Sequence, residues 1–289
     1  MLSFCKAGSC VAGVLLGIST LAAQVHAASC VWKATSPNGG TVYLGGSVHV
    51  LRSVDYPLPA AYNQAFDASN RVVFEVDEKA LNATTKGIFK EGQYPKGDSL
   101  KNHVDPRTYD YTRRLFALMN VPEAKFARCR PWFLVLMLQS GQSNGFSESG
   151  VDDFLMKRAR ANSKPVSGLE TAREHVAVYS GLSDRQAEAL LLFTFIPQER
   201  AKGDDAPWMQ AWRNGDADTV ARMMRATYRD YPTFADRLLA ERNRRWLPRI
   251  EDCARSGQTY FVVAGAAHFG GPGGLLALLR QRGFSIAQL

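Results

Sequence analysis

The chain has 289 residues, of which 46% are hydrophobic, 10% aromatic and 21% charged. This composition supplies enough apolar side chains for a buried core, and it excludes an intrinsically disordered or collagen-like protein. The formal net charge is +8, but the basic residues are scattered instead of forming a block or stripe, so we expect no nucleic-acid partner.

The first 27 residues have the pattern of a secretory signal peptide. One charge, Lys6, precedes a short apolar run, and residues 25–27 form a small-x-Ala cleavage site. The run is shorter than the about twenty apolar residues that span a bilayer. We therefore expect an exported protein, periplasmic or secreted, whose mature domain comprises residues 28–289. A lipid on Cys30 is the one expected route to the membrane, although Cys30 lacks the usual preceding leucine.

Three cysteines remain in the mature chain: Cys30, Cys129 and Cys253. None of them forms a C-x-x-C metal-binding pair. An exported protein can hold a disulfide, and the favoured pairing is Cys30 with Cys253. Three buried, unreactive thiols are the alternative.

A strand–turn–helix–strand pattern opens the mature chain. The β-branched and aromatic residues of 41–44 predict a buried strand that ends at Gly45-Gly46, and His49 follows three residues after Gly46. A helix is expected from residue 60 to about 69, followed by a second strand over 71–77.

The C-terminal segment repeats this layout. A strand over 259–264 leads to Gly265-Ala266-Ala267-His268, then a glycine-rich loop, a helix over 274–282 and a short strand over 284–286. Two histidines therefore follow a glycine at the carboxyl end of a predicted strand, which is the edge where open α/β sheets bind ligands. We expect the two strands to lie in one sheet and the two imidazoles to approach within about 5 Å. The alternative is that each imidazole only caps a turn.

The middle of the chain is mostly helical. The expected helices cover 109–119, 130–139, 153–162, 187–195 after a Ser183/Gln186 capping box, 216–228, and 233 through 246 with a bend or break at Pro248. A short strand is expected over 164–170. The sequence thus predicts an α/β fold, with a central sheet built from the two strand–GxxH–helix–strand units at the chain ends and a mostly helical insertion between them.

Two imidazoles and a carboxylate form a ligand set for a divalent metal. Zinc, manganese and cobalt accept these donors, and three protein ligands leave a position for water, whose pKa the metal lowers. Glu75 is the favoured carboxylate because its apolar neighbours predict burial, and a buried charge needs a partner. An exposed strand face is the alternative environment for Glu75.

Other polar residues are weaker candidates. Glu170 is the second choice for the carboxylate and Asp152 the third, whereas His103 and His175 are expected at the surface because polar residues flank them. The sequence contains no Gly-x-Ser-x-Gly elbow, no His-Glu-x-x-His motif and no phosphate-binding loop.

The motifs resemble the TraB/GumN family over nearly the whole mature chain. The segments that carry the resemblance are 43–50 (YLGGSVHV), 56–59 (YPLP), 73–77 (VFEVD), 149–152 (SGVD), 164–171 (KPVSGLET), 241–243 (ERN) with Trp246, and 260–268 (YFVVAGAAH). The resemblance implies kinship with Tiki-type metalloproteases and, more remotely, with erythromycin-esterase-like hydrolases.

The resemblance also implies roles for single residues. His49, Glu75 and His268 would bind the metal, and around them would lie Glu170, Arg242 and Asn243. One departure is Ala267, since many relatives have glycine directly before the second histidine; its methyl group narrows the site without removing a ligand.

Two functions remain open at this point. The first is an exported metal-dependent hydrolase that uses a metal-activated water on a peptide or another amide or ester bond. The second is a non-catalytic envelope protein that binds or sequesters a peptide signal or a polysaccharide component. The sequence does not determine the oligomeric state.

Overall fold

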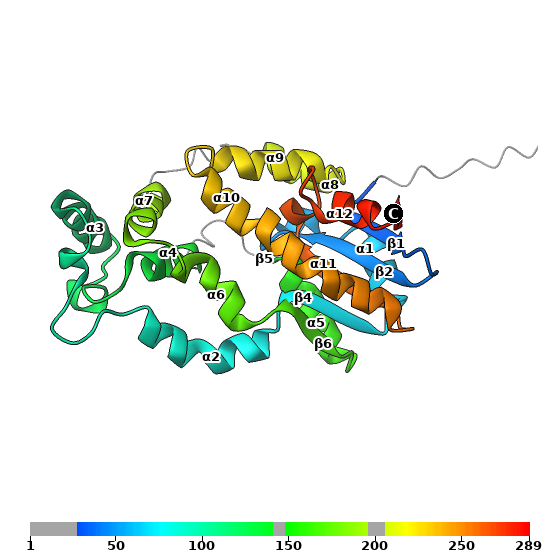
Figure 1. Ribbon diagram of the computed structural model, residues 1–289, viewed down its shortest axis with the longest axis horizontal. Coiled ribbons are helices and arrows are strands. Elements are labelled where there is room, and N and C mark those ends of the chain that lie inside the picture. Colours follow the sequence, from blue (N-terminus) through cyan, green and yellow to red (C-terminus); the bar gives the residue numbers. More distant parts are fainter. Residues whose placement is uncertain (1–27, 141–147, 196–205) are drawn as a thin grey trace, which may run out of the picture.

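The computed structural model describes residues 28–140, 148–195 and 206–289 (Figure 1). The expected signal peptide, residues 1–27, lies outside these ranges. A six-stranded sheet occupies one half of the molecule, and a group of helices from the middle of the chain occupies the other half. The predicted α/β fold class is therefore confirmed.

The sheet brings the two ends of the chain together. Its order is β6-β4-β7-β2-β1-β8, with β1 Val31–Thr35, β2 Thr41–Ser47, β4 Arg71–Val76, β6 Val166–Glu170, β7 Tyr260–Gly265 and β8 Ser285–Gln288. Strands β6, β4, β7 and β2 run parallel, whereas β1 and β8 are antiparallel to their neighbours. Since β7 pairs with β2, the expected pairing of the first and last units is confirmed.

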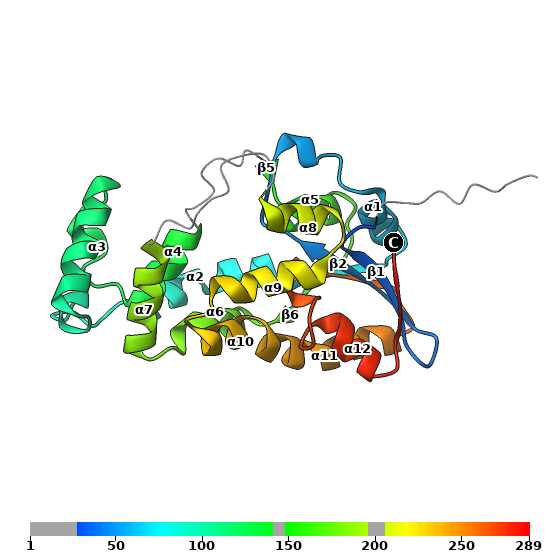
Figure 2. The same ribbon diagram turned by 90° about the horizontal axis from the view of Figure 1, so that it is seen from above.

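Helices cover both faces of the sheet. The α-helices of the described residues are α1 Ala60–Asp67, α2 Glu78–Glu91, α3 Pro106–Leu118, α4 Pro131–Ser140, α5 Val151–Ala161, α6 Ala172–Ser180, α7 Asp184–Phe195, α8 Pro207–Arg213, α9 Ala217–Thr227, α10 Pro232–Leu238, α11 Ala240–Arg255 and α12 Leu275–Gln281. Figure 2 shows α1, α5 and α8 on one face, with α11 and α12 on the other. None of the helices in the described part of the chain is both long and apolar enough to cross a membrane.

Short elements complete the connections. They are β3 Val50–Leu51, β5 Glu148–Ser149, η1 Ser53–Asp55, η2 Leu100–Asn102, η3 Glu123–Lys125 and η4 Ala266–His268. The strands β3 and β5 form a separate two-stranded sheet, which joins the segment after β2 to the segment before α5.

The apolar side chains form two cores. One surrounds the main sheet and includes the fully buried Tyr62, Trp246 and Phe261, and the other lies among the middle helices around Phe126 and Leu134. The helical region therefore has a core of its own, and the edge of the sheet faces it.

Most predicted elements are present, within a few residues of their expected bounds. The capping box before α7 is confirmed, because the Ser183 N–H donates to Gln186 Oε1 (3.0 Å) and the Gln186 N–H donates to Ser183 Oγ (3.3 Å).

Strand β1 and helices α2, α6 and α8 were not expected. Asp77, expected at the end of a strand, instead caps α2 by accepting the backbone N–H of Lys79 at 2.8 Å.

A bend or a break was expected at Pro248, and the break is absent. Pro248 lies inside α11, and the chain bends at Leu239 between α10 and α11, where φ is −115° and ψ is −75°. A proline deprives the carbonyl four residues earlier of its donor. Here that carbonyl belongs to Arg244, and because Arg244 and Pro248 are both exposed, water can take the place of the missing N–H.

The expected Cys30–Cys253 disulfide is also wrong, since Cys30, Cys129 and Cys253 are free thiols. Cys30 lies beside Gly46, at the carboxyl end of β2. Cys253 precedes Ala254, whose carbonyl packs against Gly40 just before the other end of β2. The length of a strand therefore separates the two cysteines, which is more than a disulfide spans. Burial raises the pKa of the Cys30 thiol to about 12.

Two glycine-to-alanine substitutions test the packing of α11 on the β1–β2 turn. A Cβ on Gly40 would lie 1.9 Å from the Ala254 oxygen, so Gly40→Ala must push the turn and the helix apart. We expect the free energy of unfolding to fall by about 1–3 kcal/mol. Gly87 in α2 has nothing within 4 Å of an added Cβ, so Gly87→Ala should raise this free energy by about 0.5–1 kcal/mol. Urea titration measures both, and equal effects would contradict the close contact at Gly40.

Candidate active site

The polar residues gather at the carboxyl ends of the parallel strands. Glu75 lies near the end of β4, Glu170 ends β6, and His268 follows β7 in η4. Helix α11 crosses the same edge and contributes Arg242 and Asn243. Because parallel strands end at one edge of a sheet, residues far apart in the sequence become neighbours there.

Arg242 is the centre of this group and is 3% exposed. Its Nη2 donates to Glu75 Oε2 at 2.6 Å and to Glu170 Oε1 at 2.5 Å, and its Nε donates to Glu170 Oε2 at 3.2 Å. The guanidinium also lies over the ring of Trp246, 4.5 Å from its centroid. Burial disfavours the charged form, but the two carboxylates outweigh it, so the pKa of Arg242 lies above its ordinary value.

Glu170 has no free oxygen lone pair directed towards a further ligand. Its Oε1 accepts from Arg242 and lies 2.8 Å from His175 Nδ1, while Oε2 accepts from Trp246 Nε1 at 3.1 Å and from Arg242. Burial opposes ionisation, yet the hydrogen bonds from His175 and Arg242 keep the pKa of Glu170 below its ordinary value. Glu170 therefore fixes Arg242 and is a poor metal ligand.

Glu75 faces the same group, so its expected alternative environment, an exposed strand face, is wrong. The side chain is 15% exposed, and its Oε1 accepts the Gly265 N–H at 2.8 Å. The same oxygen lies 3.7 Å from His268 Nε2. Burial opposes ionisation of Glu75, but the charge of Arg242 outweighs burial and holds its pKa well below the ordinary value.

Asn243 determines which nitrogen of His268 carries the proton. The Asn243 amide nitrogen donates to the carbonyls of His268 (3.0 Å) and Gly273 (2.9 Å), so its oxygen must accept from His268 Nδ1 at 2.7 Å. His268 is 4% exposed, and burial lowers its pKa to about 4. The ring is therefore neutral at neutral pH, with the lone pair on Nε2 directed towards Glu75 Oε1 and Arg242 Nη1.

His49 lies in a different environment, because its side chain is 82% exposed. Its Nδ1 is 3.3 Å from Asp152 Oδ2, and this interaction raises the pKa of His49 to about 9. His49 follows β2, which runs parallel to β7, so it lies at the same edge of the sheet as His268. The approach of the two imidazoles to within about 5 Å stays a prediction.

His175, expected at the surface, keeps 29% of its side chain exposed but also contacts the group around Arg242, which the sequence did not predict. Thr171 caps α6 directly after β6, and this sharp change of direction brings His175 back over Glu170. His175 Nδ1 also lies 3.3 Å from Arg242 Nη2. The signal that could have revealed it is an acid at a strand end followed at once by a capping threonine. His103, by contrast, stacks on Tyr94 in the helical half, away from this group.

Two sets of side chains could hold a metal ion. One atom each of Glu75, Glu170 and His175 lie within 4.8 Å of one another, but Arg242 Nη2 is within 3.3 Å of all three residues. A cation there would have to displace a guanidinium, so this set does not fit.

The second set is that of the expected ligands, His49, Glu75 and His268. Arg242 also contacts it, but through the other oxygen of Glu75 (Oε2) and at 3.3 Å from His268 Nε2, so a metal would displace only this long contact. Of the three residues, the structure brings only Glu75 and His268 close together. His268 Nε2 and Glu75 Oε1 are 3.7 Å apart, close to the about 3.4 Å between two ligands bonded at about 2.1 Å in a tetrahedral site. In both His49 and His268, Nδ1 faces an oxygen of a neighbouring residue, which leaves Nε2 for a metal. Because the pKa of His49 is raised, metal binding would have to displace the proton on its Nε2, while the proton on Nδ1 could stay with Asp152.

Comparisons with known proteins indicate the family of the chain. A sequence model of the TraB/PrgY/gumN family matches residues 30–288. The uncharacterized protein YbaP of Escherichia coli (strain K12) is 23% identical over 92% of this chain and 99% of its own length. Metalloproteases TIKI1 and TIKI2 of Danio rerio are each 24% identical over 84% of this chain, which spans 60% and 57% of their lengths. No solved structure matches the chain.

Removal of the central cation tests the arrangement. Arg242→Met leaves two buried carboxylates without their partner, so we expect the free energy of unfolding to fall by about 3–5 kcal/mol. Arg245 lies on the same helix but is exposed, and Arg245→Met should change this quantity by less than about 0.5 kcal/mol. Denaturant unfolding of both variants is the measurement. A loss below about 1 kcal/mol for Arg242→Met would mean that the carboxylates are not buried around it.

Proposed function

We propose that this chain, which belongs to the TraB/PrgY/gumN family, is an exported metal-dependent hydrolase of a peptide or another amide or ester bond. The observation that carries the proposal is the pair of His268 Nε2 and Glu75 Oε1, 3.7 Å apart. The first is a neutral nitrogen with its proton held on the opposite side of the ring, and the second is an ionised oxygen. A protein that only binds a ligand has no need of such a pair.

The proposed metal ligands are His49, Glu75 and His268. When bound, a zinc, manganese or cobalt ion would supply a water of lowered pKa as the nucleophile. The chain itself contributes orientation: Asn243 holds the ring of His268, and Asp152 lies against Nδ1 of His49.

Arg242 has one nitrogen that could bind the substrate. Its Nη2 and Nε are fully engaged by the carboxylates, whereas Nη1 makes only two long contacts, 3.3 Å to His268 Nε2 and 3.5 Å to the Leu238 carbonyl. A cationic donor beside the proposed ligands is suited to a substrate carbonyl oxygen that gains negative charge in the transition state.

The Tiki relatives support a peptide substrate, since they are metalloproteases. The pattern of residues 1–27 supports export to the periplasm or the medium. Lipid attachment at Cys30 is less well supported, because the Cys30 side chain is 1% exposed and a modified sulfur would have to leave the core.

Metal content separates the proposed ligands from bystanders. We expect the purified protein to retain a stoichiometric divalent ion, and the His49→Ala/His268→Ala double variant to lose it. His103 lies among the middle helices, so His103→Ala should retain the ion. Elemental analysis of the three proteins is the measurement. Full metal content in the double variant would exclude this ligand set.

Glu75→Gln tests the link between the metal and hydrolysis. Glutamine keeps the shape of the side chain but removes the negative charge, so we expect metal affinity to fall by about 10-fold or more and hydrolysis to fall with it. A peptide library incubated with manganese, cobalt or zinc detects cleavage, and calorimetric titration measures the affinity. Absence of cleavage by the wild-type protein with all three ions, despite tight metal binding, would favour the non-catalytic alternative.

A further inference from the structure

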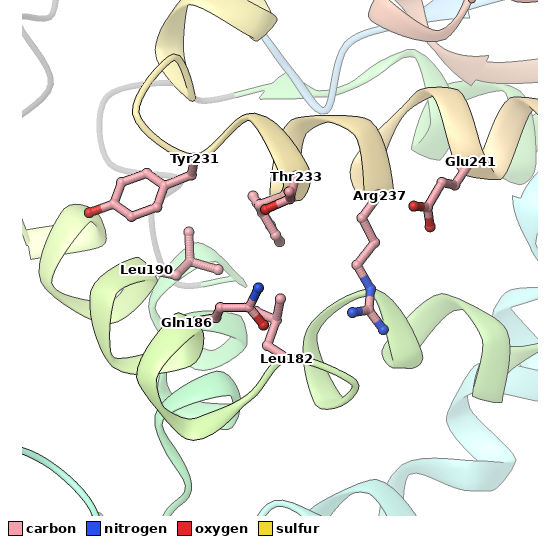
Figure 3. A pocket seen from close by; sticks show the side chains of 8 residues that line it. Leu182, Gln186, Leu190, Tyr231, Thr233, Arg237 and Glu241 are labelled. Atoms are coloured by element: carbon pink, nitrogen blue, oxygen red, sulfur yellow. The ribbon is translucent and has the colours of Figure 1, made fainter.

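The helical half contains a cavity separate from the charged group, by which we mean Arg242, Glu75, Glu170 and His175. It has a volume of about 160 Å³ and lies between α7, the turn before α7, and α10 (Figure 3). The residues that line it are Leu182, Gln186, Leu190, Tyr231, Thr233, Phe234, Arg237 and Glu241. Arg237 and Glu241 lie at one end of it in the view of Figure 3, and Tyr231 and Leu190 lie at the other.

Two of the polar side chains at this cavity, Arg237 and Gln186, have partners within the protein. Arg237 donates to the carbonyls of Gly181 (2.9 Å) and Ala177 (2.8 Å), at the end of α6. Gln186 Oε1 accepts from the backbone and the hydroxyl of Ser183. An apolar group can therefore enter without depriving these side chains of a hydrogen bond, which is the main cost of placing apolar atoms beside polar ones.

Part of the cavity wall is apolar and could contact an apolar side chain. Leu182, Leu190, Phe234 and the ring of Tyr231 present apolar atoms to the cavity. A cavity of about 150 Å³ with walls of this kind holds a benzene-sized group. The volume and lining thus suit one leucine or phenylalanine side chain.

Two helices connect the cavity to the proposed active site. His175 and Tyr179 are one turn apart on the same face of α6, and the Tyr179 ring packs on Phe234 with centroids 5.8 Å apart. Helix α10, which carries Phe234 and Arg237, continues after the bend at Leu239 into α11 and Arg242. The charged group and the cavity therefore lie one after the other along α6 and along the α10–α11 segment.

We infer that the cavity is a side-chain subsite for a hydrophobic residue of the peptide substrate, an assignment that rests on the proposed function. Because both sites lie along α6 and α10–α11, their separation is fixed. The bound leucine or phenylalanine would therefore lie at one fixed position relative to the hydrolysed bond.

Blocking the cavity tests this subsite without any need for hydrolysis. Thr233 is exposed at the cavity, so Thr233→Trp fills it without disturbing the core, and Thr84→Trp on the exposed surface of α2 is the matched control. The probes are N-acetyl-leucinamide, N-acetyl-phenylalaninamide and N-acetyl-alaninamide, observed by saturation-transfer NMR on the full chain. We expect the first two to bind the wild-type and control proteins, and to bind Thr233→Trp about tenfold more weakly. Equal binding to both tryptophan variants, or no preference over the alanine probe, would overturn the subsite.

Peptide-library cleavage separates failure of the subsite from failure of the proposed function. If the wild-type protein cleaves, we expect leucine or phenylalanine to be enriched at one fixed position relative to the cut. Thr233→Trp should remove this enrichment and Thr84→Trp should keep it. Cleavage without enrichment overturns the subsite. Probe binding without any cleavage supports the subsite and contradicts the hydrolase.

Discussion

The buried guanidinium of Arg242 is the interaction on which the edge of the sheet depends. Two carboxylates, Glu75 and Glu170, end neighbouring strands, and without an internal cation their charges would repel each other in a poorly solvated place. Arg242 forms ion pairs with both carboxylates, which reduces their repulsion, and thereby ties α11 across β4 and β6. It also divides their roles, because Glu170 directs both oxygens at fixed partners while Glu75 keeps one oxygen turned towards His268.

The two Gly-x-x-His motifs are alike in sequence and unlike in structure. His268 follows the central strand β7 and lies beneath α11, so burial keeps it neutral. His49 follows β2 on a segment that turns outward to form β3, and contact with Asp152 favours its proton. Motif spacing determines that an imidazole stands at the strand end, whereas the elements packed above it determine its charge.

The sequence predicted the features that depend on residues close together along the chain, such as the strands. Runs of β-branched and aromatic residues identified β2, β4 and β7, and the apolar neighbours of Glu75 indicated its burial. His175 was missed because its polar sequence neighbours face solvent while its own ring contacts Glu170, which only the arrangement of β6 against α6 reveals. The cysteine pairing failed for the same reason, since nothing in the sequence states that Cys30 and Cys253 flank opposite ends of one strand.

The central position of β7 constrains how the protein can fold during synthesis. β7 separates β2 from β4, so the parallel core of the sheet cannot close until Tyr260–Gly265 have left the ribosome. Closing so long a loop is entropically costly and slow. The nascent chain therefore spends nearly all of its translation without a completed sheet, which exposes its unpaired strands to aggregation and to chaperones.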